Sequence, residues 1–484
     1  MSDQKIYKPK PISGFPEWLP EYRAVELQWM DKIRKVFESY GYCSIETPAV
    51  EEVEALLAKG GETEKEIYTL HRLQDDRSVG FGDGSGYGGG SADGAGHGDG
   101  SGFSDARLAL HFDLTVPMAR YVAQHFNELV FPFKRYQMQK SWRGERPQKG
   151  RFREFTQCDI DVVNADSLPL HFDAEMPAII WEVLKGLPGM ETEKFLIRIN
   201  NRKLLAGYLN AIGVKDEKLL TDVMRAIDKG EKSASAYNDS IVRICHEHNL
   251  ELPSKGGKLF EQIGQLTCIK AGNPDILEEK LDKLIFTRND LFEAGKKELI
   301  FVLNALAHIP EGEIIADLSI VRGLDYYTGT VYETMFFDNT SYGSICSGGR
   351  YDDLASQYIS RKLPGVGISI GFSRLFTYLH ERGKLPVGQK SPTQVLVILP
   401  SEERRAEASK TAQDLRARGF NVELYHAAKK IPDQLKYASR KGIPYVWFPP
   451  FSDGQPHEVK NMTSGKQTPT DPATWTMPIK EMLK

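Results

Sequence analysis

The sequence predicts an α+β fold with a strand-rich core, a helical insertion and a small C-terminal α/β domain. Strand-like runs gather at residues 106–163 and return from residue 318 onward. Between them, residues 215–310 are rich in Lys, Glu and Leu at helical spacing. After residue 392, short apolar runs alternate with helical segments, which is the pattern of an α/β domain.

Domain boundaries follow from length and from proline and glycine content. A chain of 484 residues is too long for one simple core, so we expect two or three domains. Residues 382–394 combine Pro, Gly and Lys without periodicity and predict a linker. We predict a core over residues 1–388, interrupted by the insertion at 215–310, and a C-terminal domain over 392–484. Its alternating strands and helices are expected at residues 394–400, 402–418, 421–425, 432–440 and 445–450.

The first elements of the core have clear boundaries. Apolar residues on one helical stripe predict a helix over residues 21–40, and Gly41 ends it. Residues 42–50 then predict a strand that Pro48 interrupts. A proline at this place favours the edge of a sheet or an interface.

A glycine-rich tract at residues 80–102 separates two strand-like segments, 66–73 and 106–116. We expect these segments to form a hairpin with an enlarged, flexible tip. The tract contains a literal G-x-G-x-x-G at residues 84–89. It follows no apolar strand and opens no helix, so its context argues against a phosphate-binding loop.

Composition limits the class of protein. The net charge of −4 excludes a uniformly basic surface but leaves room for a local one. Five scattered cysteines without a C-x-x-C pair predict reduced thiols and no metal site. The N-terminal residues show no secretory signal, and no apolar run reaches the length of a membrane span, so we expect a cytoplasmic protein without a membrane partner.

The most unusual chemistry lies in residues 134–163. Residues 134–153 hold eight basic side chains and one acidic one, Glu145, around a Gly- and Pro-containing loop. Such a loop could reach a polyanion, because arginine donates two hydrogen bonds to phosphate, or it could be a solvated hairpin tip. In the strand that follows, alternation puts Gln157, Asp159 and Asp161 on one face, as in a strand that lines a polar pocket.

Three further segments carry candidate binding residues. Alternation in residues 106–116 places Asp113 and Thr115 together, where they could hold an ammonium group or simply lie at a surface strand edge. Arg322 stands beside a glycine, just before a predicted strand with two tyrosines. Arg374 opens a predicted helix after a glycine-rich strand, where an anion would be favoured. Together, these residues suit a triphosphate and a small cationic or zwitterionic molecule.

Five segments resemble the motifs of one enzyme family. Residues 41–50 (GYCSIETPAV), 141–161 (SWRGERPQKGRFREFTQCDID) and 365–375 (GVGISIGFSRL) are similar to motifs 1, 2 and 3 of class II aminoacyl-tRNA synthetases. Residues 322–333 (RGLDYYTGTVYE) and 346–354 (CSGGRYDDL) resemble the two motifs specific to the histidyl-tRNA synthetases. The resemblance spans nearly the whole chain, and it implies an antiparallel catalytic sheet flanked by helices and a C-terminal anticodon-binding domain.

The resemblance implies a role for each candidate residue. Arg143 and Arg322 would be catalytic, on either side of the ATP α-phosphate, where two arginines stabilise the charge that develops on phosphorus. Glu145 would lie near the adenine, and Arg374 would hold the γ-phosphate. The histidine-binding residues implied in this way are Asp113, Leu114, Thr115, Gln157, Asp161, Arg322, Tyr326 and Tyr327.

The family's reaction and partners are implied in the same way. Histidine and ATP, which binds with Mg²⁺, give histidyl-adenylate and pyrophosphate, and the histidyl group then moves to the 3′ end of tRNA(His). Arg146, Lys149 and Arg151 of the motif 2 loop would approach the acceptor stem of the tRNA. The resemblance also implies a homodimer, formed through the motif 1 region that contains Pro48.

Two positions depart from the family pattern, and two other functions are possible. Many relatives have arginine where this chain has His111, and some have glutamate in place of Asp161. One alternative is a catalytically inactive regulator of histidine biosynthesis or a sensor of uncharged tRNA. Such proteins tend to lack the C-terminal domain or the arginine that Arg322 matches. Another is a ligase that adenylates a different small acid, against which the basic loop and the C-terminal domain argue.

Overall fold

The computed structural model describes residues 8–57, 66–70, 107–232, 234–250, 258–321, 323, 327–353 and 355–477. The glycine-rich tract at 80–102, Arg322 and Tyr326 lie outside these residues. The chain divides into two compact units. The first extends to Lys384 but leaves out Glu17–Gln28, and the second contains Glu17–Gln28 together with the chain from Leu385 onward.

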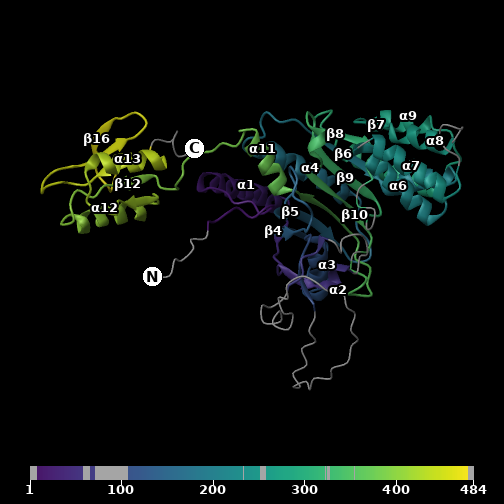
Figure 1. Cartoon of the computed structure of the whole chain (residues 1–484), viewed down its shortest axis with the longest axis horizontal. Helices are drawn as coiled ribbons and strands as arrows, with labels where there is room; N and C mark the ends of the chain where they lie inside the picture. The colour runs from purple at the N-terminus through teal and green to yellow at the C-terminus, as the bar shows by residue number, and fades with distance from the viewer. Residues whose placement is uncertain are drawn as a thin grey trace, which may run out of the picture. The chain divides into compact units, whose positions relative to one another are not determined.

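A nine-stranded sheet is the centre of the first unit (Figure 1). Neighbouring strands are antiparallel except for the parallel pairs β1–β4 and β6–β8. The predicted α+β class, with an antiparallel-rich sheet, is therefore confirmed. In spatial order the strands are β1 (Cys43–Ser44), β4 (Phe133–Trp142), β5 (Glu154–Val163), β11 (Gly365–Ile370), β10 (Cys346–Tyr351), β9 (Thr330–Phe336), β6 (Phe195–Asn201), β8 (Ile314–Asp317) and β7 (Lys270–Ala271).

Helices cover one face of this sheet. They are α1 (Pro20–Ser39), α4 (His171–Gly186) and α11 (Phe372–Glu381). The predicted stripe of α1 is confirmed, because Trp29 is fully buried and meets Phe372 and Phe376 of α11 edge-on. Aromatic pairs of this kind add to the hydrophobic contribution of their buried area. The helices thus leave the opposite face of the central strands available for chemistry.

A small two-stranded sheet stands beside the large one. It pairs β2 (Val50–Glu52) with β3 (Leu108–Leu110), and α2 (Val53–Leu57) and α3 (Thr115–Gln124) follow these strands. The amide of Leu70 donates to the carbonyl of Leu108 at 2.9 Å, so the two ends of the predicted hairpin do pair. The prediction that the second strand continues through residue 116 is wrong, because the strand ends at Leu110 and a helix begins at Thr115.

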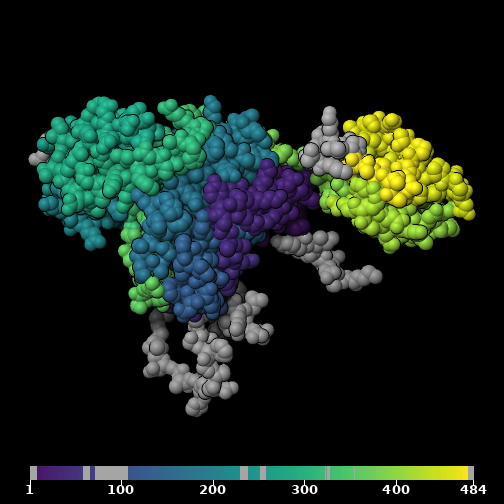
Figure 2. Space-filling view, turned by 180° about the vertical axis from the view of Figure 1, so that it is seen from behind, coloured from purple at the N-terminus to yellow at the C-terminus, as the bar shows by residue number. Residues whose placement is uncertain are grey.

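The region between β6 and β8 is mostly helical and gathers at one end of the first unit (teal in Figures 1 and 2). Helices α5 and α10 pack closely because Gly207 and Gly295 have no side chains. A Cβ atom at Gly207 would lie 2.4 Å from the amide nitrogen of Phe292. The helices are α5 (Arg202–Ala211), α6 (Glu217–Lys232), α7 (Ala234–Glu247), α8 (Lys258–Thr267), α9 (Pro274–Asp282) and α10 (Asp290–Ala305).

The second unit has a five-stranded sheet between two helices. Alternate residues of its strand β12 (Val395–Val397) face opposite sides, Val395 toward a cluster that includes α12 and Leu396 toward a cluster that includes α13. The predicted alternation of strands and helices is confirmed, but the last two strands were missed. The elements are β12 (Val395–Val397), α12 (Arg405–Ala417), β13 (Val422–Leu424), α13 (Ile431–Lys441), β14 (Tyr445–Phe448), β15 (His457–Asn461) and β16 (Gln467–Thr470). Among the described residues of both units, none of the helices has the length and apolar character needed to cross a bilayer.

Candidate active site

Three neighbouring strands present polar side chains on the face opposite the helices. Directly opposed residues of neighbouring strands share a face. Gln157, Asp159 and Asp161 of β5 therefore lie on the same side as their partners on β4 and β11. The intervening Cys158 and Ile160 are fully buried on the helical side, so the predicted alternation is confirmed. We call the following residues the polar face: Arg135, Gln137, Gln139, Gln157, Asp159, Asp161, Gly367 and Ser369.

Asp161 is held by two neighbours on this face. The Nη2 atom of Arg135 lies 2.6 Å from its Oδ2, and the hydroxyl of Tyr351 donates to its Oδ1 at 3.1 Å. Glycine is required at position 367, because a Cβ atom there would lie 1.9 Å from the same Oδ1. Arg135 is fully buried, and the sequence analysis counted it only as part of the basic run. The charge of Asp161 is thus already balanced from within the sheet.

Asp159 is buried on the same strand without such a balance. Burial raises the pKa of its carboxyl to about 7, although nearby Arg135 and a hydrogen bond with Ser369 oppose this. The negative charges of Asp161 and Asp113 raise it further. Asp159 was not among the predicted binding residues, yet burial strongly raises the pKa of its carboxyl.

Asp113, Leu114 and Thr115 form the start of α3 rather than a strand. The Oδ1 atom of Asp113 accepts hydrogen bonds from the amides of Thr115 and Val116, each at 3.1 Å, which satisfies two free donors at the helix N-terminus. The predicted alternation of Asp113 and Thr115 on a strand is therefore wrong. Leu114 is fully buried. Asp113 still contributes to the site, because its charge acts on Asp159.

Arg143 directly follows β4, and a hydrogen bond from its Nε holds the side chain in place. Its Nε donates to the carbonyl of Phe112 at 3.1 Å, and its guanidinium carbon lies 5.1 Å from the centroid of the Phe155 ring. Its backbone amide also donates to the carbonyl of Arg153. These contacts orient the guanidinium from one side, and Phe112 directly precedes Asp113.

The basic loop between β4 and β5, residues 143–153, is closed by a tight turn. Gln148 and Arg151 exchange backbone hydrogen bonds at 3.2 and 2.9 Å. Glu145 is half-buried and accepts a hydrogen bond from Arg151 at 3.1 Å. Arg146, Lys149 and Arg151 are exposed, and Lys149 also lies 3.5 Å from Glu381. The loop thus presents its cations to solvent, as an anion-binding loop requires.

Arg374 brings α11 together with this loop. Its Nε donates to the carbonyl of Gly150 at 2.8 Å, and its Nη1 donates to the carbonyl of Ser344 at 2.5 Å. Burial and then the positive charge of Arg151 lower the pKa of Arg374, and Arg143 acts in the same direction. The predicted ATP-binding residues Arg143, Glu145 and Arg374 therefore lie in one electrostatic neighbourhood.

Tyr327 lies before β9, so the prediction that it belongs to a strand is wrong. Its amide donates to the carbonyl of Gly323 at 3.1 Å. Its ring covers Gly349 of β10, where a Cβ atom would lie 2.8 Å from the Tyr327 Cγ. Gly349 pairs with Gly367, and Gly367 pairs with Asp161, so Tyr327 lies close to the polar face. The predicted roles of Arg322 and Tyr326 fall outside the described residues.

Pro48 is tied to the end of β4 through His111. The Nδ1 atom of His111 lies 3.1 Å from the carbonyl oxygen of Pro48, and its Nε2 lies 2.7 Å from that of Lys140. The backbone of His111 also bonds to Ala49 and Trp142, at 3.1 Å each. This fully buried side chain therefore joins the Pro48 segment to the strand that leads to Arg143.

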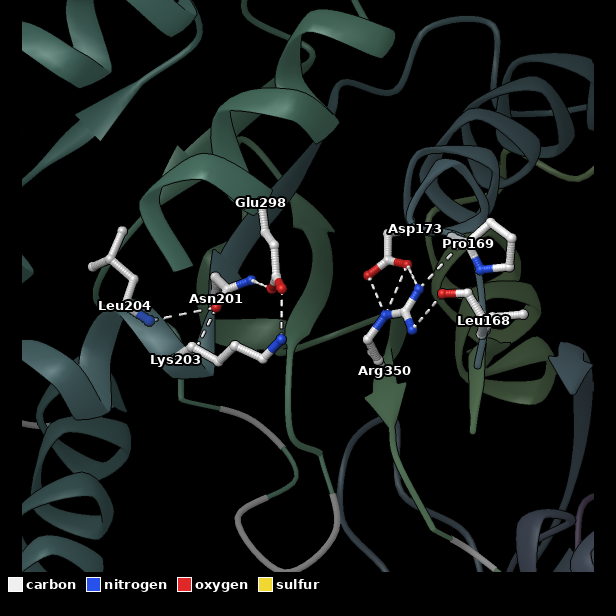
Figure 3. A network of polar contacts seen from close by, with 8 residues as sticks. All are labelled: Leu168, Pro169, Asp173, Asn201, Lys203, Leu204, Glu298 and Arg350. Atoms are coloured by element: carbon white, nitrogen blue, oxygen red, sulfur yellow. Dashed lines mark hydrogen bonds and ion pairs between the residues drawn. The ribbon is translucent and has the colours of Figure 1, made fainter. Parts of the chain in front are cut away.

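A buried ion pair lies on the helical side of the sheet (Figure 3). Arg350 of β10 donates to both carboxylate oxygens of Asp173 in α4 and to the carbonyls of Leu168 and Pro169. Its neighbour Tyr351 points instead to Asp161 on the polar face. In the motif CSGGRYDDL, Arg350 therefore joins the sheet to α4, and the next residue, Tyr351, contacts the polar face. Nearby, Asn201 caps α5 and, with Lys203, binds Glu298.

One acidic cluster lies elsewhere, in the helical region. Asp222, Glu247 and His248 bring their oxygen and nitrogen atoms within 4.8 Å of one another. His248 already contacts Asp222 at 3.3 Å, and Arg243 lies 4.0 Å from the same carboxylate. These contacts account for the cluster as a network of polar contacts around the buried Asp222, so it carries no argument for a metal.

Comparison with known proteins agrees with this geometry. Residues 100–375 match the family model of histidyl-tRNA synthetase, and residues 394–483 match that of an anticodon binding domain. The chain is 52% identical to the histidine–tRNA ligase of Thermobifida fusca (strain YX), over 98% of this chain and 100% of the relative. The crystal structure of histidyl-tRNA synthetase from Nostoc sp. PCC 7120 is 34% identical, with a TM-score of 0.77 over 96% of this chain and 97% of that one.

A further structure shows the fold alone. It is described as an ATP phosphoribosyltransferase regulatory subunit/histidyl-tRNA synthetase from Bacillus halodurans C. It is 22% identical, with a TM-score of 0.68 over 92% of this chain and 99% of that one.

Proposed function

Because the chain belongs to the histidyl-tRNA synthetase family, as a histidine–tRNA ligase, we propose that it activates histidine with ATP on the polar face and passes the histidyl group to tRNA(His). The observation that carries this proposal is that acidic side chains and phosphate-binding candidates lie in the same part of the first unit. The acids of β5 offer sites for a small cation, and Arg143, Glu145 and Arg374 lie together where a triphosphate would be bound.

In the first step, the carboxylate of histidine attacks the α-phosphorus of ATP, and pyrophosphate leaves. The carboxylate is already a nucleophile, so the protein contributes position and charge rather than a general base. Arg143 and Arg322 are the residues proposed to stabilise the charge that develops on the α-phosphate oxygens. The Phe112 carbonyl and the Phe155 ring hold Arg143 in advance, which reduces the reorganisation needed during reaction.

ATP is proposed to enter as its Mg²⁺ complex and to lie along the basic loop and α11. Arg374 is the candidate for the γ-phosphate, because its hydrogen bonds from Nε and Nη1 to Gly150 and Ser344 hold its guanidinium in place beside the basic loop. Glu145 is the candidate residue beside the adenine. The electrostatic coupling among Arg143, Arg151 and Arg374 favours a polyanion between them.

Histidine is proposed to bind between the start of α3, the strand β5 and Tyr327. Asp113, Leu114, Thr115 and Gln157 are the candidate residues for the α-amino end. Asp161, Tyr326 and Tyr327 are those for the imidazole. A buried acid that faces a ring nitrogen selects imidazole over aliphatic side chains, because a wrong substrate leaves it without a partner.

The tRNA is proposed to contact both units. The exposed cations Arg146, Lys149 and Arg151 suit the phosphates of the acceptor stem. The match of residues 394–483 to an anticodon binding domain suits the other end of the tRNA. We also propose a cytoplasmic homodimer formed through the motif 1 region, where Pro48 is anchored by His111.

The proposal is tested by two assays on the full-length protein. Histidine-dependent exchange between ATP and pyrophosphate measures the first step, and charging of tRNA(His) measures both. We expect exchange with histidine and not with other amino acids, followed by charging. Folded protein that supports neither reaction would instead fit the inactive regulator, which no specific feature of this chain favours.

A further inference from the structure

Two oxygen atoms on the polar face are buried without a hydrogen-bond partner among the described residues. They are the Oε1 of Gln157 and the Oδ1 of Asp159. Gln157 is 9% exposed and Asp159 is 3% exposed, so bulk water does not satisfy either atom well. A buried acceptor left unpaired costs free energy, and a charged one costs more. The pair therefore marks a place where a donor is missing from the protein.

The hydrogen bonds of Ser369 explain why these atoms in particular are free. The Nε2 of Gln157 donates to the Oγ of Ser369 at 2.8 Å. The single hydroxyl proton of Ser369 is then available for Asp159, with which its side chain is hydrogen-bonded. This relay fixes the amide of Gln157 with its nitrogen toward β11, so that its oxygen remains an acceptor.

The charges around Asp159 show what kind of donor is missing. Asp161 on β5 and Asp113 before α3 are both acids. The nearby cation, Arg135 on β4, is already 2.6 Å from Asp161. The Oδ1 of Asp113 already accepts hydrogen bonds from the amides of Thr115 and Val116. A donor that also carries positive charge therefore completes the site better than a neutral one.

We propose that Asp159 is a further substrate-binding residue, whose Oδ1, together with the Oε1 of Gln157, accepts hydrogen bonds from the α-ammonium group of histidine. This inference rests on the proposed function and assigns a residue that the sequence analysis left out. An ammonium group is charged at neutral pH and offers three donors, whereas a neutral imidazole offers one. The two free acceptors, one of them ionisable, match the ammonium group.

The test compares two ligands on the full-length protein by titration calorimetry. L-Histidine has the ammonium group, and 3-(imidazol-4-yl)propionate lacks it. Asp159→Asn removes the charge at nearly the same size, and Asp166→Asn is a matched control at an exposed aspartate paired with Arg361. At pH 8 we expect Asp159→Asn to weaken histidine binding about 10- to 100-fold, the range for a charged hydrogen bond. We expect no change for the propionate.

The pH dependence of histidine affinity gives a second test of the role of Asp159. Ionised Asp159 binds the ammonium group, and in the ligand-free protein its carboxyl has a pKa of about 7. Histidine affinity of the wild type should therefore rise between pH 6 and pH 8, more than in Asp159→Asn. The variant corrects for the imidazole of the substrate, which titrates in the same window.

The outcomes separate this inference from the proposed function. If the wild type neither binds histidine nor supports exchange, the proposed function fails. If the wild type binds histidine and Asp159→Asn changes its affinity less than threefold, or weakens both ligands equally, the role of Asp159 is wrong. If Asp159→Asn does not fold, Ser369→Ala takes its place. It frees the amide of Gln157 to turn, and it is expected to weaken histidine but not the propionate.

Discussion

Asp159 and Asp161 differ by two positions on one strand, yet their surroundings differ because only Asp161 has a cation of its own, Arg135. Alternation along the strand is visible in the sequence, and it correctly placed both on one face. The same rule applied to β4 would have placed Arg135 beside them, but its charge was grouped with the basic loop. What no pattern shows is which acid Arg135 pairs with, because that depends on the register between β4 and β5.

Arg143 tests the catalytic assignment. We expect Arg143→Ala to slow histidine-dependent exchange at least about a hundredfold, the scale for the loss of one preorganised donor to a developing charge. The same loss is expected for Arg322→Ala. Thermal melting of both variants should match the wild type. Arg146→Ala, in the same loop but exposed, should affect charging of tRNA much more than exchange. Near-normal exchange by folded Arg143→Ala would contradict the assigned role.

Asp159 also makes a prediction about stability. Its pKa is raised from 3.8 to about 7 in the folded, ligand-free protein, so the folded state keeps a proton that the unfolded state loses between these values. Its contribution to stability is therefore present below about pH 4 and is lost as the pH rises through 7. Thermal melting without ligand should show the wild type losing more stability than Asp159→Asn between pH 5.5 and pH 8. Parallel curves would mean that the carboxyl is solvated after all.

At the scale of elements, the main strands and helices were predictable and the junctions were not. The alternation of residues 106–110 continues by chance to residue 116, which hid the start of α3. Asp113 is a residue type that often precedes a helix, but the alternating pattern around it led to the prediction of a strand instead. Strands β15 and β16 were missed because they are polar and include Pro469, and they are strands because β15 pairs with β14 and β16 pairs with β15.

The ion pair between α4 and β10 makes a prediction about packing. Asp173→Asn leaves the buried guanidinium of Arg350 without a carboxylate, and breaking such a pair costs about 3–5 kcal/mol. Urea unfolding should show this loss in the unit that contains the large sheet. Asp166→Asn, at an exposed pair with Arg361, should cost far less, because solvent screens the attraction between exposed charges. Equal losses in the two variants would mean that Asp173 and Arg350 are not buried together.

At the scale of the whole molecule, the sequence predicted the order of the parts better than the fine structure of the site. Five motifs in order along the chain identified the family, and the comparisons agree with it. The order of motifs does not reveal that Arg350 and Tyr351 face opposite sides of the sheet. That separation comes from the alternation of side chains along β10, and the register, which places Arg350 opposite Val366 and Tyr351 opposite Gly365, decides which face each one takes.

The glycine-rich tract at 80–102 makes a prediction about the molecule as a whole. Replacing it with a short turn should leave exchange within about threefold of the parent, or about 0.7 kcal/mol. The ends of the hairpin already pair through Leu70 and Leu108, and a shorter connection changes the closure entropy only slightly. Exchange assays and thermal melting of the trimmed protein measure this. A much larger loss of exchange would mean that the tract closes over the substrate.

The backbone bond between Leu70 and Leu108 also has a practical consequence. Because the chain leaves and re-enters the fold at neighbouring points, another domain can be inserted there without disrupting the fold. A fluorescent protein or an affinity tag spliced into residues 80–102 would be tethered on both sides and could not trail away as a terminal tag does. Because β3 leads within a few residues to Asp113, such a label would be attached close in sequence to a residue proposed to bind histidine.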